Sequence, residues 1–144
     1  ECVRSEGFSG LLGRGDLTTV GNYMRVSHNG DRRWTYSPDG QQRRFTVQTD
    51  SESIRRLALA ETDLVQVPGR YGCSTQAIDR IVDLASRADG VIGAQITGAG
   101  LGGCAVVMVK SEWREGLLDM LRLKVGENRA FVSRPVAGAG LLSL

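Results

Sequence analysis

Apolar residues recur at helical spacing in three parts of the chain, residues 16–29, 74–88 and 111–126, and predict three amphipathic helices. A shorter helix is expected at 51–60. The residues expected to cap the N-termini of these helices are Asp16, Ser51, Ser74 or Thr75, and Ser111. Glycine ends all three long patterns, as Asn29-Gly30, as Asp89-Gly90 and as Gly126, which is typical of helix C-termini.

Continuous apolar runs at 91–96 and 104–110 predict two strands, and residues 130–133 predict a last one. Residues 1–15 are glycine-rich and show no clear period. Residues 34–70 are turn-rich, beginning with Ser37-Pro38-Asp39-Gly40, and are expected to form either an ordered insertion or a mobile loop. This order of elements favours one antiparallel sheet with helices packed on one face, an α+β domain.

A glycine cluster separates the two predicted strands and is the best candidate for chemistry. Its residues are Thr97, Gly98, Ala99, Gly100, Leu101, Gly102 and Gly103. Glycine permits positive φ, and amides turned one way form a cradle for anions, so the cluster predicts a phosphate-facing loop. Strand-like residues after Gly103 argue against a dinucleotide fingerprint, and no Gly-Lys-Ser/Thr follows, which excludes a P-loop. A tight glycine hairpin without a ligand is the alternative.

Length and composition predict one globular domain, spanning residues 1–144, with 41% hydrophobic and 24% charged residues. A net charge of +2 gives no electrostatic case for nucleic acid, and the arginine pairs at 32–33, 43–44 and 55–56 are interpreted as solvated surface. No apolar run is long enough for a membrane span, and no signal peptide is present. The first residue is Glu1 rather than methionine, so a fragment of a longer protein is expected.

Metal and disulfide chemistry find little support in the sequence. Three cysteines lack C-x-x-C spacing and His28 is the single histidine, so neither a zinc site nor a disulfide framework is expected. Cys104 opens an apolar strand and is predicted to be buried. This cysteine usage fits a reducing, cytoplasmic location.

Four segments, in order along the chain, resemble motifs of the GHMP sugar kinases and are closest to those of galactokinases. They are Met24-Arg25-Val26-Ser27-His28, Tyr71-Gly72-Cys73-Ser74-Thr75-Gln76-Ala77-Ile78-Asp79, the glycine segment from Gly90 to Val106, and the ending from Phe131 to Gly140. The resemblance spans residues about 20 to 140. It implies the C-terminal lobe of such a kinase, a ferredoxin-like α+β domain with an insertion at about 34–70.

The same resemblance implies an ATP-dependent sugar-1-kinase that moves the γ-phosphoryl of ATP to a monosaccharide hydroxyl with Mg²⁺. It implies that the partner is a missing N-terminal lobe with the catalytic groups, so none is expected here. The loop from Thr97 to Gly103 would face the ATP–sugar cleft. Residues expected to support it from behind are Ser27, His28, Ser74 and Asp79. The alternative is a non-catalytic ferredoxin-like module that binds a small molecule or regulates.

Some residues depart from the galactokinase pattern and leave the acceptor sugar open. Gln95 stands where a basic residue is usual, Ala99 where glycine is frequent, and Leu101 where phenylalanine is usual. Galactose, arabinose and a uronic acid all remain candidates. Arginines of the 34–70 segment could pair with a substrate carboxylate, which would favour a uronic acid.

Overall fold

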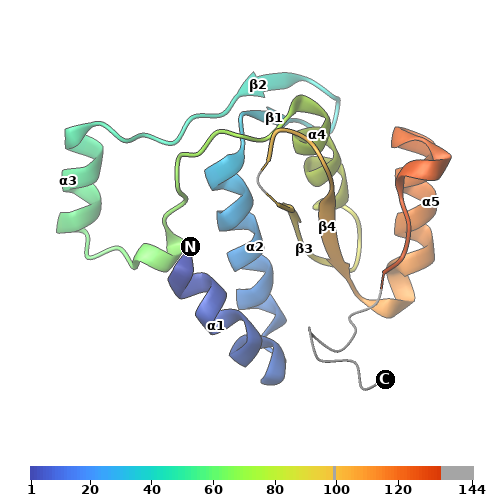
Figure 1. Ribbon diagram of the computed structural model, residues 1–144, viewed down its shortest axis with the longest axis horizontal. Coiled ribbons are helices and arrows are strands. Elements are labelled where there is room, and N and C mark those ends of the chain that lie inside the picture. Colours follow the sequence, from blue (N-terminus) through green and yellow to red (C-terminus); the bar gives the residue numbers. More distant parts are fainter. Residues whose placement is uncertain (99, 134–144) are drawn as a thin grey trace, which may run out of the picture.

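The computed structural model describes residues 1–98 and 100–133 (Figure 1). The helices are α1 (Cys2–Gly13), α2 (Leu17–Asp31), α3 (Ser51–Leu59), α4 (Gln76–Ala85) and α5 (Arg114–Val125), with short 3₁₀ turns at Leu64–Gln66, Ser111–Trp113 and Glu127–Arg129. The strands are β1 (Trp34–Tyr36), β2 (Gln42–Arg44), β3 (Val91–Ile96) and β4 (Ala105–Val109), which form two separate antiparallel pairs.

Local side-chain caps explain where three helices begin. Asp16 accepts the N–H of Thr19 at 3.1 Å to start α2, and the Thr75 hydroxyl accepts the N–H of Ile78 at 3.3 Å to start α4. For α3 the cap is Asp50 rather than the expected Ser51, because Asp50 Oδ1 accepts the N–H of Ser53 at 2.9 Å. The carboxylate one residue earlier reaches the free amides of the first turn.

The β3–β4 pair carries the main core. Its register pairs Ala94 with Val107 and Ile96 with Ala105, and a bulge lies between Val91 and Gly93. Helices α4 and α5 pack on one face of this pair and complete a buried cluster. Its members are Ile78, Val82, Ala85, Ala94, Ile96, Leu117 and Leu121. The predicted α+β class with an antiparallel sheet is therefore confirmed.

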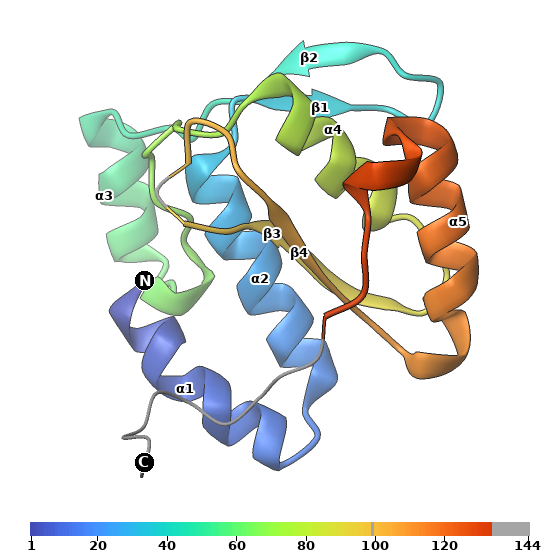
Figure 2. The same cartoon turned by 45° about the vertical axis from the view of Figure 1, so that its right-hand side comes forward.

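A second cluster lies on the other side of β3. Leu11 of α1 and Val20 and Met24 of α2 pack there with Ile92 and Met108, and both views place the β3–β4 pair between α2 and α5 (Figure 2). The bulge makes this possible, because it turns Ile92 toward α2 while Ala94 faces α4 and α5. The sheet pair is thus covered by α1 and α2 on one side and by α4 and α5 on the other.

Residues 34–70 form defined structure. The hairpin β1–β2 turns at Pro38-Asp39-Gly40, where Gly40 has a φ of 84°, and it lies against α4. α3 stands apart from the sheet in both views (Figures 1 and 2). Segment 34–70 therefore consists of a hairpin, a helix and a 3₁₀ turn, which run back to residues 70–73 beside the C-terminal end of α2.

Some sequence predictions were wrong. Residues 1–15, expected to lack a regular element, contain α1, because Leu11 and Phe8 pack on α2 and outweigh the low helix propensity of Gly7 and Gly10. No described strand pairs with residues 130–133, and Phe131 is 75% exposed, so the expected last strand is absent there. Residues from 134 onward lie outside the described part of the chain.

Candidate functional site

The glycine loop is a closed hairpin loop between β3 and β4. Thr97 closes it twice, since both its N–H (2.9 Å) and its hydroxyl (3.1 Å) donate to the carbonyl oxygen of Cys104. Positive φ values occur at every described loop position from 98 to 103. They are 75° at Gly98, 83° at Gly100, 61° at Leu101, 130° at Gly102 and 90° at Gly103, while Ala99 lies outside the described residues. Such a backbone needs glycine at most positions.

A second chain segment, residues 70–73, holds the tip of the loop. The N–H of Leu101 donates to the carbonyl oxygen of Cys73 at 2.7 Å. A Cβ on Gly100 would lie 2.5 Å from Cys73 Sγ and 2.9 Å from the Cys73 carbonyl oxygen, so only glycine fits there. Leu101 itself is 84% exposed. The loop is therefore fixed at its base and at its tip, with one side open to solvent.

The open side presents donors. Among the described residues, no acceptor serves the backbone N–H groups of Gly98, Gly100, Gly102 and Gly103. Exposed amides on a backbone of positive φ suit an anion, since each N–H carries a partial positive charge. That the loop faces a phosphate stays a prediction, and the amides without acceptors are consistent with it.

His28 lies fully buried behind the base of the loop. Its Nδ1 accepts the N–H of Ile96, the last residue of β3, at 3.3 Å. A nitrogen that accepts carries no proton, so the ring hydrogen lies on Nε2. That Nε2 lies 3.3 Å from Asp79 Oδ1, and both side chains are 0% exposed. His28 of α2 is therefore in contact with α4 through Asp79 and with β3 through Ile96, the residue before Thr97.

Asp79 is the centre of this buried group. Its Oδ2 accepts the N–H of Arg33 at 3.1 Å and of Trp34 at 2.8 Å. Burial raises the pKa of the Asp79 carboxyl. The contacts with His28, Ser74 and the two amides outweigh that effect and hold the pKa below its ordinary value. An ionised Asp79 thus binds the C-terminal end of α2, the start of β1 and α4 together.

This lowered pKa predicts a specific pH dependence of stability. A carboxyl group whose folded-state pKa is depressed stabilises the fold above its unfolded pKa and loses that contribution as pH falls through the folded value. The difference in unfolding free energy between the wild type and Asp79→Asn should be constant at neutral pH and shrink below about pH 3.8. Urea titrations at a series of pH values measure it. A difference that grows as pH falls would contradict the assignment.

Ser74 and Ser27, predicted to support the loop, lie in different places. Ser74 is 1% exposed and its N–H donates to the Asp31 carbonyl oxygen at 2.8 Å, beside the His28–Asp79 pair. The hydroxyl of Ser27 instead donates to Glu1 at 2.8 Å. Ser27 lines a separate pocket of about 280 Å³ with Tyr23 and Gln95. The structure brings together His28, Ser74 and Asp79 and leaves Ser27 outside the group.

Residues that the sequence interpretation did not assign to the site also contribute. Cys73 donates its thiol hydrogen to Asp31 Oδ1 at 3.0 Å, and burial together with the Asp31 carboxylate raises the pKa of that thiol. Cys104, predicted to be buried, is exposed because it closes the loop at its solvent side. Arg32, predicted to be solvated, is 8% exposed and pairs with Asp83 at 2.6 Å. Such pairings join residues far apart in sequence.

Comparison with known proteins places this architecture in a family. The family described as GHMP kinases C terminal matches residues 43–122, just over half of the chain, including Ser74, Asp79 and the glycine loop. The chain belongs to this family. The matched range contains Asp79 but not its neighbour His28, which precedes residue 43.

Two curated galactokinases are similar over shorter stretches. The galactokinase of Clostridium acetobutylicum is 40% identical over 50 residues, which are 35% of this chain and 13% of that protein. The galactokinase of Clostridium beijerinckii is 38% identical over 58 residues, 38% of this chain and 15% of that protein. The matched stretch thus covers only a small share of each relative. No solved structure matches the chain.

Within residues 1–98 and 100–133, no group of three or more His, Cys, Asp or Glu side chains is arranged to hold a metal ion. Within the same residues, no helix is both long and apolar enough to cross a bilayer.

Proposed function

We propose that this chain is the C-terminal lobe of an ATP-dependent, galactokinase-like sugar-1-kinase of the cytoplasm. The observation that carries the proposal is the loop from Thr97 to Gly103. It presents amides without acceptors among the described residues, and it belongs to a GHMP kinase C-terminal domain with galactokinase relatives. Its partner would be an N-terminal lobe that carries the catalytic groups and the Mg²⁺ ligands, with a monosaccharide hydroxyl as acceptor.

ATP, when bound, supplies the γ-phosphoryl group and Mg²⁺ offsets its charge. The role of this chain would be to position the phosphoryl group and to exclude water from the cleft. The N–H groups of Gly98, Gly100, Gly102 and Gly103 would form one wall of the cleft, and preorganised amides stabilise phosphoryl oxygens without having to reorient. His28 and Asp79 would hold that wall in place by fixing the amide of Ile96 at its base.

The proposal is tested with the full-length protein, ATP, Mg²⁺ and a panel of galactose, arabinose and galacturonate. Turnover of one sugar to its phosphate ester is the expected result. Absence of ATP-dependent turnover with every sugar, from a folded full-length protein, would favour the alternative of a non-catalytic ferredoxin-like binding module. Turnover of galacturonate alone would assign a role to the arginines of the 34–70 segment.

Replacing Gly100 with valine should lower turnover by at least about tenfold, because 1.4 kcal/mol of lost positioning already amounts to a factor of ten. The new Cβ would lie 2.5 Å from Cys73 Sγ at a φ of 83°, so the loop must leave residues 70–73. Steady-state kinetics on the full-length protein measure the effect.

Gly98→Ala is the matched control for this variant. Its φ is 75°, but no atom lies within 4 Å of the new Cβ, so only the backbone strain of about 1–2 kcal/mol applies. Gly98→Ala should therefore retain more activity than Gly100→Val. Wild-type turnover by a Gly100→Val protein with an unchanged thermal melt would show that the loop does not position the phosphoryl group.

A further inference from the structure

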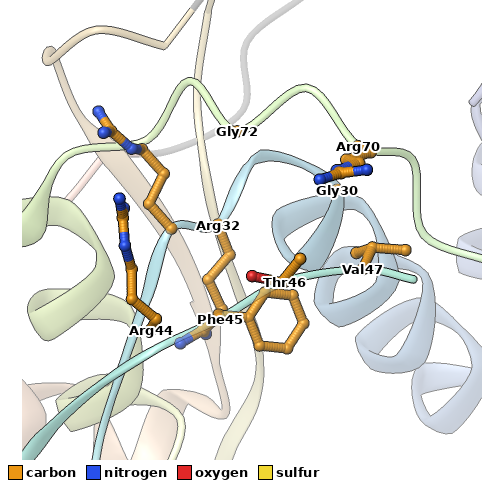
Figure 3. Close-up of a pocket in the computed structure, with 9 residues that line it drawn as sticks. Gly30, Arg32, Arg44, Phe45, Thr46, Val47, Arg70 and Gly72 are labelled. Carbon is orange, nitrogen blue, oxygen red and sulfur yellow. The ribbon is translucent and has the colours of Figure 1, made fainter. Parts of the chain in front are cut away.

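A basic pocket of about 260 Å³ opens at the same end of the molecule as the glycine loop, next to residues 70–73 (Figure 3). It lies between the C-terminal end of α2, the hairpin β1–β2 and the segments 45–47 and 70–72. Its lining residues are Gly30, Arg32, Arg33, Arg44, Phe45, Thr46, Val47, Arg70 and Gly72. Four of the nine are arginines and none is acidic, which makes this pocket a distinct electrostatic feature of a nearly neutral chain.

One of the four arginines serves the fold. Arg32 is 8% exposed, and its charge is balanced by Asp83 at 2.6 Å, with a further bond to the Trp34 carbonyl oxygen at 3.1 Å. Figure 3 shows its side chain running alongside Phe45, and the guanidinium carbon lies 5.8 Å from the ring centroid. Arg32 thus holds Phe45 at the floor of the pocket.

The other three arginines are exposed and form no salt bridge with a described residue. Among the described residues, no carboxylate lies within 4.0 Å of Arg33, Arg44 or Arg70. The acidic side chains nearby have other neighbours: Asp31 accepts from Cys73, and Asp79 accepts from two amides and lies 3.3 Å from His28. Within the described residues the pocket therefore holds three guanidinium groups that form no ion pair.

Two of these side chains are already fixed. Arg44 lies over the ring of Trp34, with 4.6 Å to the centroid, and the two residues are directly opposite in the β1–β2 register. Arg70 donates to the hydroxyl of Thr49. Figure 3 shows Arg44 at one end of the pocket and Arg70 at the other, with Phe45 and Thr46 between them. A ligand would meet preordered guanidinium groups at two places rather than one.

We propose that this pocket binds a small molecule that carries a diphosphate group, with one phosphoryl at Arg33 and Arg44 and the other at Arg70. Guanidinium groups match phosphoryl oxygens with two parallel hydrogen bonds, which a single point charge does not offer. Two dianionic groups also balance three cations better than a lone carboxylate does. The Phe45 side chain provides an apolar floor for the part of the ligand that extends from the diphosphate. This site is separate from the glycine loop and does not depend on the proposed kinase activity.

Isothermal titration of the purified full-length protein with pyrophosphate, orthophosphate and galacturonate tests the proposal, without sugar or Mg²⁺. Pyrophosphate should bind saturably at one site and at least about tenfold more tightly than orthophosphate. Arg44→Gln and Arg70→Gln should each weaken pyrophosphate binding by about tenfold or more. Amide shifts of Phe45 and Thr46 on pyrophosphate addition locate the ligand by NMR.

Arg55→Gln is the control, because Arg55 is an exposed arginine of α3 outside the pocket. It should leave pyrophosphate binding unchanged, whereas equal weakening by all three variants would mean diffuse attraction and overturn the proposal. Galacturonate that binds as tightly as pyrophosphate would overturn it in favour of a carboxylate site. Absence of saturable pyrophosphate binding would overturn the proposal. Binding that is lost in Gly100→Val but retained in Arg44→Gln would overturn it in favour of the glycine loop.

Discussion

Asp79→Asn should lower the free energy of unfolding by about 3 kcal/mol at neutral pH, because every group around this carboxylate is a donor. The amides of Arg33 and Trp34 donate to one oxygen, and the protonated Nε2 of His28 faces the other. Asparagine is nearly the same size but replaces one oxygen with an NH₂ group. Its NH₂ group must therefore face either His28 or the two amides, which are donors themselves. Because the site is fully buried, no water can satisfy these groups.

Urea denaturation measures this loss, and Asp119→Asn is the control. Asp119 is an exposed acid on α5, so its replacement should change stability by less than about 0.5 kcal/mol. Hydrogen exchange adds a local measurement, since the Ile96 amide is held by His28 and should exchange faster in Asp79→Asn. Equal stability of the two variants, together with an unchanged Ile96 amide, would mean that the His28–Asp79 pair does not hold the base of the loop.

The elements that the sequence predicts correctly are those that depend on residues close together in the chain. The helix caps at Asp16 and Thr75 act within three residues, and the strand–glycine–strand unit from Val91 to Val109 is contiguous. The turn residues 37–40 were also predicted, but the strands β1 and β2 on either side of them were not. For these parts the order of polar and apolar residues already contains the reason for the structure.

The rest depends on contacts between distant residues. The resemblance indicated His28 and Asp79 separately, but the ring orientation follows from an amide 68 residues away, at Ile96. The basic pocket likewise gathers Arg32 and Arg33, Arg44, and Arg70 from three segments. The arginine pairs at 32–33 and 43–44 are typical of solvated surface in the sequence. The register of Trp34 with Arg44, and the bonds from Tyr71 and Gly72 to Gly30, bring these arginines and Arg70 to one place.

Both inferred binding features share one support. Residues 70–73 hold the glycine loop through the Cys73 carbonyl oxygen and line the basic pocket through Arg70 and Gly72. The amides of Tyr71 and Gly72 in turn donate to the Gly30 carbonyl oxygen, at 2.7 and 3.2 Å. The C-terminal end of α2 is therefore the common base for the loop and the pocket, and the placement of α2 on β3 becomes the critical packing contact.

Gly21→Ala should destabilise the domain by about 3 kcal/mol or more, because α2 and β3 meet there backbone to backbone. A Cβ on Gly21 would lie 1.9 Å from the Ile92 carbonyl oxygen, a group of the sheet that has no side-chain freedom. On the strand side, the Cα of Gly21 lies 3.0 Å from where a Cβ of Gly93 would be. The helix must move away from the strand, which opens the cluster around Val20 and Met24 and pulls His28 off Ile96.

Gly116→Ala is the same substitution in a helix without the contact, and the pair separates packing from helix propensity. No atom lies within 4 Å of a Cβ on Gly116 in α5, so alanine should stabilise by about 0.5–1 kcal/mol through its better propensity. Thermal and urea unfolding should therefore give opposite signs for the two variants. A Gly21→Ala protein as stable as Gly116→Ala would mean that α2 does not rest on β3 at Ile92, and the support of the glycine loop by His28 would have to be abandoned with it.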